Sequence, residues 1–110
     1  MAPTNDPVDA HRAKMISLVF IWRLSKKPMH GYSLARELRN AGPVVCKPAT
    51  VYALLADLEK RGLITGKMDS ADSHPRKVFH STAKGRKFYE TAKREKVKGL
   101  MREFYADLLR

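Results

Sequence analysis

The stretch KPATVYALLADLEKRG, residues 47–62, has the pattern of a helix with both ends marked. Pro48 stands in the first turn, where its missing N–H is not needed, and Gly62 stands where helices end in a left-handed residue. One side of this helix carries apolar residues at helical spacing and therefore faces a core. These residues are Val51, Leu54, Leu55 and Leu58.

The opposite side of the same helix is built mainly of small residues. It carries Ala49, Ala53, Ala56 and Lys60, with Thr50, Tyr52 and Asp57 at its flanks. A surface of alanine methyl groups is smooth enough to be pressed against another macromolecule. The rest of the chain indicates what that macromolecule is.

The charge balance favours a polyanionic partner. The chain has 110 residues, enough for one small domain, and its 22 Lys and Arg against 11 Asp and Glu give a net charge of +11. Such an excess is typical of nucleic-acid binding, although a generically basic protein or one that touches anionic membranes would also show it. No apolar run is long enough to span a bilayer, so no membrane role is expected. The single cysteine, Cys46, excludes an intramolecular disulfide and fits a reducing cytoplasm.

The N-terminal sequence is expected to form a loose arm followed by a deeply buried helix. Residues 1–8 form the expected arm, and Asp9 is expected to cap a helix from Ala10 to Ser25. The apolar residues of this helix point in nearly every direction, so it must be buried on more than one side. In so small a chain, one of those sides is expected to meet a second subunit.

The next segments predict a helix-turn-helix followed by a wing. A second helix is expected over Tyr32–Ala41, with an irregular turn leading into residues 47–62. Beyond Gly62 the pattern changes to two short strands, 63–68 and 77–80, joined by a polar turn. This is the pattern of a β-hairpin wing.

One long helix is expected to end the chain, from Ala83 to Leu109, with Thr82 as its cap. Its apolar stripe changes sides partway along, so that one stripe can dock on the chain's own domain and the other on a partner. The predicted fold is therefore mainly α with a small β-hairpin. It consists of a winged helix-turn-helix over 9–82 and a C-terminal dimerisation helix over 83–110, in addition to the N-terminal dimerisation helix.

Three segments resemble the PadR family of transcriptional regulators: HGYSLAREL (30–38), ATVYALLADLEKRGLI (49–64) and PRKVFHSTAKGR (75–86). With the flanking helices, the resemblance covers about residues 10–109. It implies a homodimer that binds a palindromic operator in double-stranded DNA, usually as a repressor released by a small molecule. The short C-terminal region is similar to the branch with a single terminal helix. The chain departs from the common pattern at Ala49, Val78 and Ser81, where the family usually has glycine, tyrosine and leucine.

The basic and small residues of these segments are the candidate DNA contacts. The cations would bind phosphates and release condensed counterions, and Thr50 and Tyr52 would add neutral hydrogen bonds. Between Pro48 and Leu58 there is no Arg, Lys, Asn or Gln to read base edges strongly, so direct readout is expected to be thin, with DNA shape and half-site spacing important. The full candidate set is Arg36, Arg39, Lys47, Ala49, Thr50, Tyr52, Ala53, Lys60, Arg76 and Lys77.

Two further sets of residues follow from the expected dimer. The candidate interface is Ile16, Val19, Phe20, Val97, Leu100, Met101, Phe104 and Leu108. A pocket for a small aromatic or apolar effector could be lined by Trp22, Met101, Phe104 and Tyr105, although plain core packing explains the same residues.

Nothing in the sequence predicts an enzyme, a cofactor or a metal site. Cys46 lacks a second cysteine for redox chemistry, and the four histidines lack ligand companions at metal-binding spacing. The favoured function is a sequence-specific DNA-binding regulator, cytoplasmic and associated with the nucleoid. The alternatives are a winged-helix protein–protein adaptor and a non-specific DNA-packaging protein.

Overall fold

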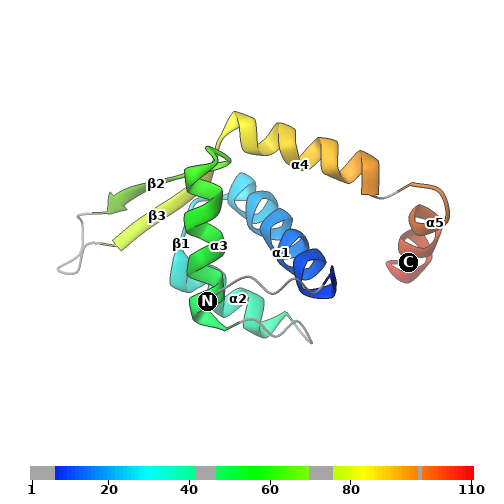
Figure 1. Ribbon diagram of the computed structural model, residues 1–110, viewed down its shortest axis with the longest axis horizontal. Coiled ribbons are helices and arrows are strands. Elements are labelled where there is room, and N and C mark those ends of the chain that lie inside the picture. Colours follow the sequence, from blue (N-terminus) through cyan, green and yellow to red (C-terminus); the bar gives the residue numbers. More distant parts are fainter. Residues whose placement is uncertain (1–6, 42–46, 70–75, 97) are drawn as a thin grey trace.

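The computed structural model describes residues 7–41, 47–69, 76–96 and 98–110. The chain is mainly helical and carries a small sheet, as the sequence predicted (Figure 1). The elements run in the order α1 (Pro7–Lys26), β1 (Met29–His30), α2 (Gly31–Asn40), α3 (Pro48–Lys60), β2 (Ile64–Asp69), β3 (Arg76–Ser81), α4 (Ala83–Lys96) and α5 (Leu100–Leu108).

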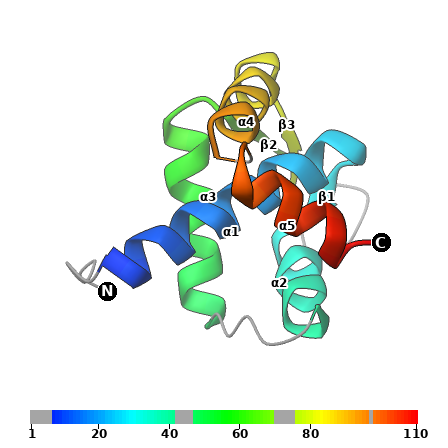
Figure 2. The same ribbon diagram turned by 90° about the vertical axis from the view of Figure 1, so that its right-hand side faces the viewer.

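Helix α1 is the centre of the molecule and packs against α3, β3 and α4 (Figures 1 and 2). Its residues Phe20 and Ile21 are almost completely buried and meet Leu55 and Leu58 of α3 in the same core. Each large apolar side chain removed from water contributes about 2 kcal/mol to folding. The two helices are therefore held together mainly by apolar burial, and the apolar side of α3 faces the core as predicted.

The three strands form one antiparallel sheet in the order β1-β3-β2. Strands β2 and β3 make the predicted hairpin, in which Ile64 pairs with Ser81 and Asp69 with Arg76. Strand β1 was not predicted, because two residues are too few to show an alternating pattern. It adds Met29 and His30 to the free edge of β3.

Both predicted ends of α3 are confirmed. Pro48 lies in the first turn, and Gly62 has a φ of 76°, a left-handed conformation that favours glycine. The N–H of Leu63 donates to the carbonyl of Leu58, and the N–H of Gly62 donates to that of Glu59, both at 3.0 Å. This pair of bonds is a Schellman motif, which stops the helix and directs the chain into the wing.

Two helix boundaries were predicted wrongly. Helix α1 begins at Pro7 instead of Ala10, since a proline is readily accommodated in a first helical turn. The single terminal helix expected over 83–109 is in fact two helices, α4 and α5. Gly99 separates them with a φ of 61°, and an α-helix cannot continue through that conformation.

Buried Ser81 ties the sheet to the central helix. Its hydroxyl donates a hydrogen bond to the main-chain carbonyl of Ile21, within the buried region between β3 and α1. A buried hydroxyl is costly only when it lacks a partner. The serine at this position, where leucine is usual in the resembled family, therefore replaces an apolar contact with a satisfied polar one.

Candidate nucleic-acid interface

The exposed side of α3 is smooth and lies beside the start of α2. Ala49, Ala53 and Ala56 are exposed there, and Tyr52 is 48% exposed. Tyr52 packs over Gly31, where an added Cβ would lie only 2.9 Å from the tyrosine ring. Because Gly31 has no side chain, the Tyr52 ring of α3 can pack against the first turn of α2. Thr50, at the flank, is half-buried.

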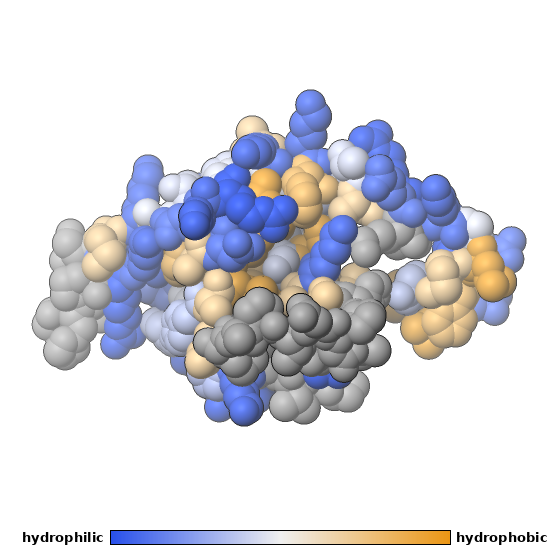
Figure 3. All heavy atoms as spheres, viewed as in Figure 1, coloured by the Kyte–Doolittle hydropathy of each residue, from blue (hydrophilic) through white to orange (hydrophobic). Residues whose placement is uncertain are grey.

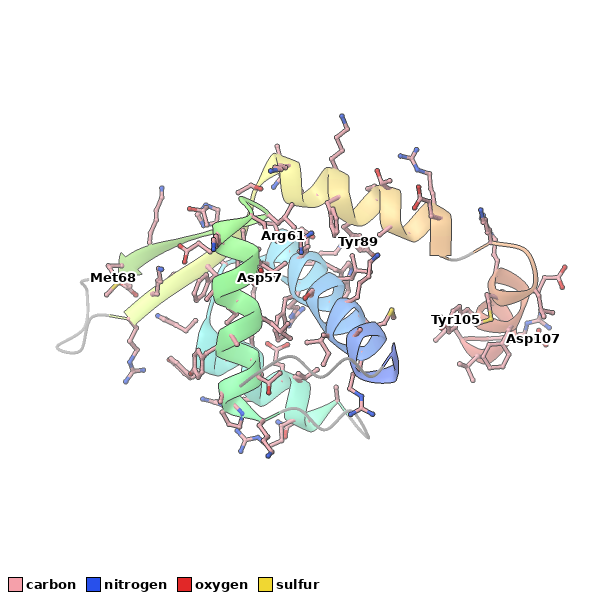
Figure 4. The ribbon with its side chains drawn as sticks, viewed as in Figure 1. Asp57, Arg61, Met68, Tyr89, Tyr105 and Asp107 are labelled. Carbon is pink, nitrogen blue, oxygen red and sulfur yellow. The ribbon has the colours of Figure 1, made fainter. Side chains whose placement is uncertain are left out.

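Cations lie around this smooth face on three elements. Arg36 and Arg39 are exposed on α2, Lys47 directly precedes α3, and Arg76 begins the second wing strand. Lys60 is exposed in the last turn of α3. The neighbouring Arg61 instead pairs with Asp57 at 3.5 Å, and both side chains lie on the later turns of α3 (Figure 4). The exposed surface of α3 is thus bordered by positive charge.

Lys77 is less available than its sequence position suggested. Its Nζ lies 2.7 Å from Oε1 of Glu59, and the other carboxylate oxygen, Oε2, accepts the N–H of Gly66 at 3.1 Å. The Lys77 side chain is still 43% exposed, so a DNA phosphate could compete for it. In the free protein its contact is internal, and it connects the wing to α3.

A groove runs between α1 and α4 on another part of the molecule. It has a volume of about 190 Å³ and is lined by Met15, Leu18, Val19, Trp22, Tyr89, Ala92 and Lys93. Tyr89 points from α4 toward α1 (Figure 4). Trp22, in the opposite wall on α1, is 42% exposed. The lining is almost wholly apolar, which suits a flat apolar ligand or an apolar side chain from another molecule.

Helix α5 extends away from the body and contains no buried residue. Hydrophobic side chains gather on it in Figure 3, and its exposed members include Leu100, Met101, Phe104 and Leu108. Phe104 and Tyr105 have tilted rings whose centres are 5.7 Å apart. An apolar helix surface of this kind is unusual for a face that stays in water.

One of the predicted groupings needs correction, and another stays a prediction. Ile16 and Phe20, expected at a dimer interface, are 4% and 1% exposed and belong to the chain's own core. Within one chain, Trp22 lines the α1–α4 groove, whereas Met101, Phe104 and Tyr105 lie on the separate helix α5 (Figure 1). The effector pocket was expected between the helices of a dimer, so this grouping stays a prediction. Val97 lies outside the described residues.

Comparison with known proteins decides the family. The model of the transcriptional regulator PadR-like family matches residues 21–91, which is more than half of the chain. The chain belongs to the PadR-like family. No curated protein sequence matches it significantly. Members of this family are transcriptional regulators, which are generally not enzymes, and membership implies DNA-binding regulation.

Solved structures of similar fold agree with this assignment. A PadR-family regulator from Bacillus cereus is 26% identical, with a TM-score of 0.70, over 88% of this chain and 93% of that one. One from Clostridium difficile is 25% identical, with a TM-score of 0.69, over 86% and 98%. A third, from Eggerthella lenta, is 24% identical and shows the fold alone, with a TM-score of 0.74 over 94% and 88%.

The remaining candidates are the cysteine and the histidines. Cys46 and His74 fall outside the described residues, so the interpretation of both stays a prediction. Among the residues that the structure describes, no three His, Cys, Asp or Glu side chains gather as a metal site. Within the same residues, no helix is long and apolar enough to cross a membrane.

Sequence reasoning missed one residue of the surface, Tyr32. Its exposed ring lies at the start of α2 with Arg36 and Arg76 over it, their Cζ atoms 5.7 and 4.9 Å from the ring centre. The four-residue spacing of Tyr32 and Arg36 on one helix was a usable signal. The contact between Tyr32 and Arg76 left no signal in the sequence, because it depends on how the wing packs beside α2.

Proposed function

We propose that this PadR-like protein is a homodimer that binds palindromic double-stranded DNA with sequence preference and acts as a repressor. The observation that carries the proposal is the exposed alanine face of α3, bordered by cations from α2 and the wing. A helix with small side chains can enter a major groove while flanking cations contact the phosphates. The wing arginine then lies where it can meet the adjacent backbone.

Affinity in this proposal comes chiefly from phosphate contacts. Arg36, Arg39 and Arg76 are exposed cations on two separate elements, so they can reach different phosphates. Each phosphate neutralised releases condensed counterions, and binding therefore weakens steeply as salt is added. Sequence preference would come from Thr50, Tyr52 and the alanine methyls, together with the shape of the DNA and the spacing of two half-sites.

The dimer is supported by the unburied apolar surface of α5. An isolated helix of nine residues is marginal in water, so α5 needs a surface to pack on. The apolar α1–α4 groove of a second copy, with Val19 and Trp22 in its wall, is a surface of matching character. Two copies would then present two α3 helices to two half-sites.

The same groove supports a response to a small molecule. A flat aromatic or apolar effector could stack on Trp22 and Tyr89, the two large aromatic side chains that line it. If α5 of the partner rests there, an effector would compete with it and alter the distance between the α3 helices. Such a regulator would work in the cytoplasm, at the nucleoid.

Fluorescence anisotropy on labelled duplexes tests the proposal. Binding should be tight at low salt, should fall steeply as salt rises, and should prefer some duplexes over others. Absence of binding even at low salt would instead support a protein–protein adaptor. Equal affinity for every duplex would support non-specific packaging.

A further inference from the structure

The ring of Tyr32 is the meeting point of three charged or polar side chains from two parts of the fold. His30, on β1, stacks on it with ring centres 5.2 Å apart and an angle of 20° between the planes. Arg36, one turn further along α2, has its Cζ 5.7 Å from the ring centre. Arg76, from β3, is closer, at 4.9 Å. The ring therefore bridges the helix-turn-helix and the loop end of the wing, where β2 ends and β3 begins.

The two arginines keep their positive charge available. Within the described part of the chain neither Arg36 nor Arg76 forms an ion pair, whereas Arg23, Arg61 and Lys77 all do. Both guanidinium groups are instead held by the face of an aromatic ring. That interaction restrains a cation without neutralising it.

The loop end of the wing is joined to the same cluster by a second contact. Asp69 pairs with Arg76 across the β2–β3 ladder, and its Oδ2 lies 3.7 Å from Nε2 of His30. Thus His30, stacked on Tyr32, is also close to the last residue of β2. The backbone that carries Arg76 and the ring that restrains its side chain belong to one connected unit.

We propose that Tyr32 is a positioning residue that holds Arg76 in place for DNA. An arginine side chain loses much conformational freedom when it binds a phosphate or enters a groove, and a ring that restrains it beforehand lowers that loss. Tyr32 acts through Arg76 rather than by a hydrogen bond of its own hydroxyl. The inference rests on the proposed DNA-binding function.

A double-mutant cycle measured by anisotropy tests this role. Tyr32→Leu removes the ring, and Tyr32→Phe keeps it while removing the hydroxyl. Each is combined with Arg76→Gln and, as the matched control, with Arg36→Gln. Thermal melting of every variant establishes that it is folded, and variants that fail to fold are replaced by Tyr32→Met.

Tyr32→Leu should weaken DNA binding about tenfold, the product of a loss of a few-fold at each half-site. Tyr32→Phe should bind within about twofold of the unmodified protein, since the ring face is retained. The Tyr32→Leu loss should disappear in the Arg76→Gln background and persist in the Arg36→Gln background.

Two results would overturn the role of Tyr32 while leaving DNA binding intact. A Tyr32→Phe loss as large as that of Tyr32→Leu would assign the effect to the hydroxyl. An equal Tyr32→Leu loss with and without Arg76 would show that the ring does not act through the arginine. If the unmodified protein binds no duplex, the proposed function fails instead.

Discussion

The carboxylate of Glu59 joins the last turn of α3 to the wing, because it contacts Nζ of Lys77 at 2.7 Å and accepts the N–H of Gly66 at 3.1 Å. Gly66 and Lys77 lie on the two strands of the hairpin. One side chain of α3 therefore holds both strands. We expect this residue to help set the angle between α3 and the wing, on which simultaneous contacts with DNA depend in the proposed function.

Removing the two contacts of Glu59, one with Lys77 and one with Gly66, should lower the free energy of unfolding by separate amounts. Glu59→Gln retains an acceptor for Gly66 but loses the ion pair, and should lower the free energy of unfolding by about 0.5 kcal/mol. Glu59→Ala loses both contacts and should lower it by about 1–2 kcal/mol. Urea denaturation followed by circular dichroism measures both changes.

Asp57→Asn is the matched control for the Glu59 variants. Asp57 pairs with Arg61 on the same helix at 3.5 Å, and both side chains are about half exposed. An exposed pair of this kind contributes little, so its loss should change stability by less than about 0.5 kcal/mol. A Glu59→Ala effect no larger than that of Asp57→Asn would show that Glu59 does not hold the wing.

Because α3 has few side chains that can read base edges, we expect mutations on its exposed side to have similar effects on different DNA sequences. Thr50→Ala and Tyr52→Phe should each weaken binding modestly and by similar factors on operator variants, because neither side chain reads one base strongly. Anisotropy against a panel of single-base-pair operator variants measures this. A tenfold or larger loss confined to particular base pairs would show that these residues read sequence directly.

We expect dimerisation to depend on the apolar surface of α5. Phe104→Asp places a charge on that surface and should shift the protein toward monomer in sedimentation velocity at micromolar concentration. Met68→Asp is the control, since Met68 is 61% exposed on the wing, away from α5 (Figure 4). If the unmodified protein is already a monomer, the dimer and the two-half-site arrangement are both wrong.

The chain contains one tryptophan, Trp22, and it lines the groove, so its fluorescence can report on ligands that enter there. Planar apolar molecules that enter beside Trp22 should quench it in a saturable manner, and the same molecules should weaken DNA binding. Ala92→Phe would fill the groove without adding a second tryptophan, and should abolish the saturable effect without affecting the fold of α2, α3 and the wing. Quenching that leaves DNA affinity unchanged would argue against an effector role.

The elements with regular periodicity were predictable from the sequence. Helix α3 was found to within a residue or two, because Pro48, Gly62 and an apolar stripe mark its ends and its buried side. The hairpin was found because its strands are separated by turn-forming residues. Strand β1 was missed because its pairing with β3 is a long-range contact of only two residues.

Contacts that depend on tertiary folding were not predictable from spacing. Lys77 was expected to be a DNA contact, yet it lies against Glu59, 18 positions earlier in the chain. Tyr32 was missed because Arg76 reaches it from the wing. Ile16 and Phe20 were placed at a partner surface because a helix that is apolar all round does not reveal which of its sides meets its own domain.

We propose that α3, its flanking cations and the wing form a surface that selects particular DNA sites. Genomic footprinting with the purified protein at physiological salt, compared with the promoter of its own gene, tests this proposal. We expect discrete protected sites that share an inverted repeat, with two half-sites separated by about one helical turn or a multiple of it. Uniform protection without a shared repeat, or no protection at all, would contradict it.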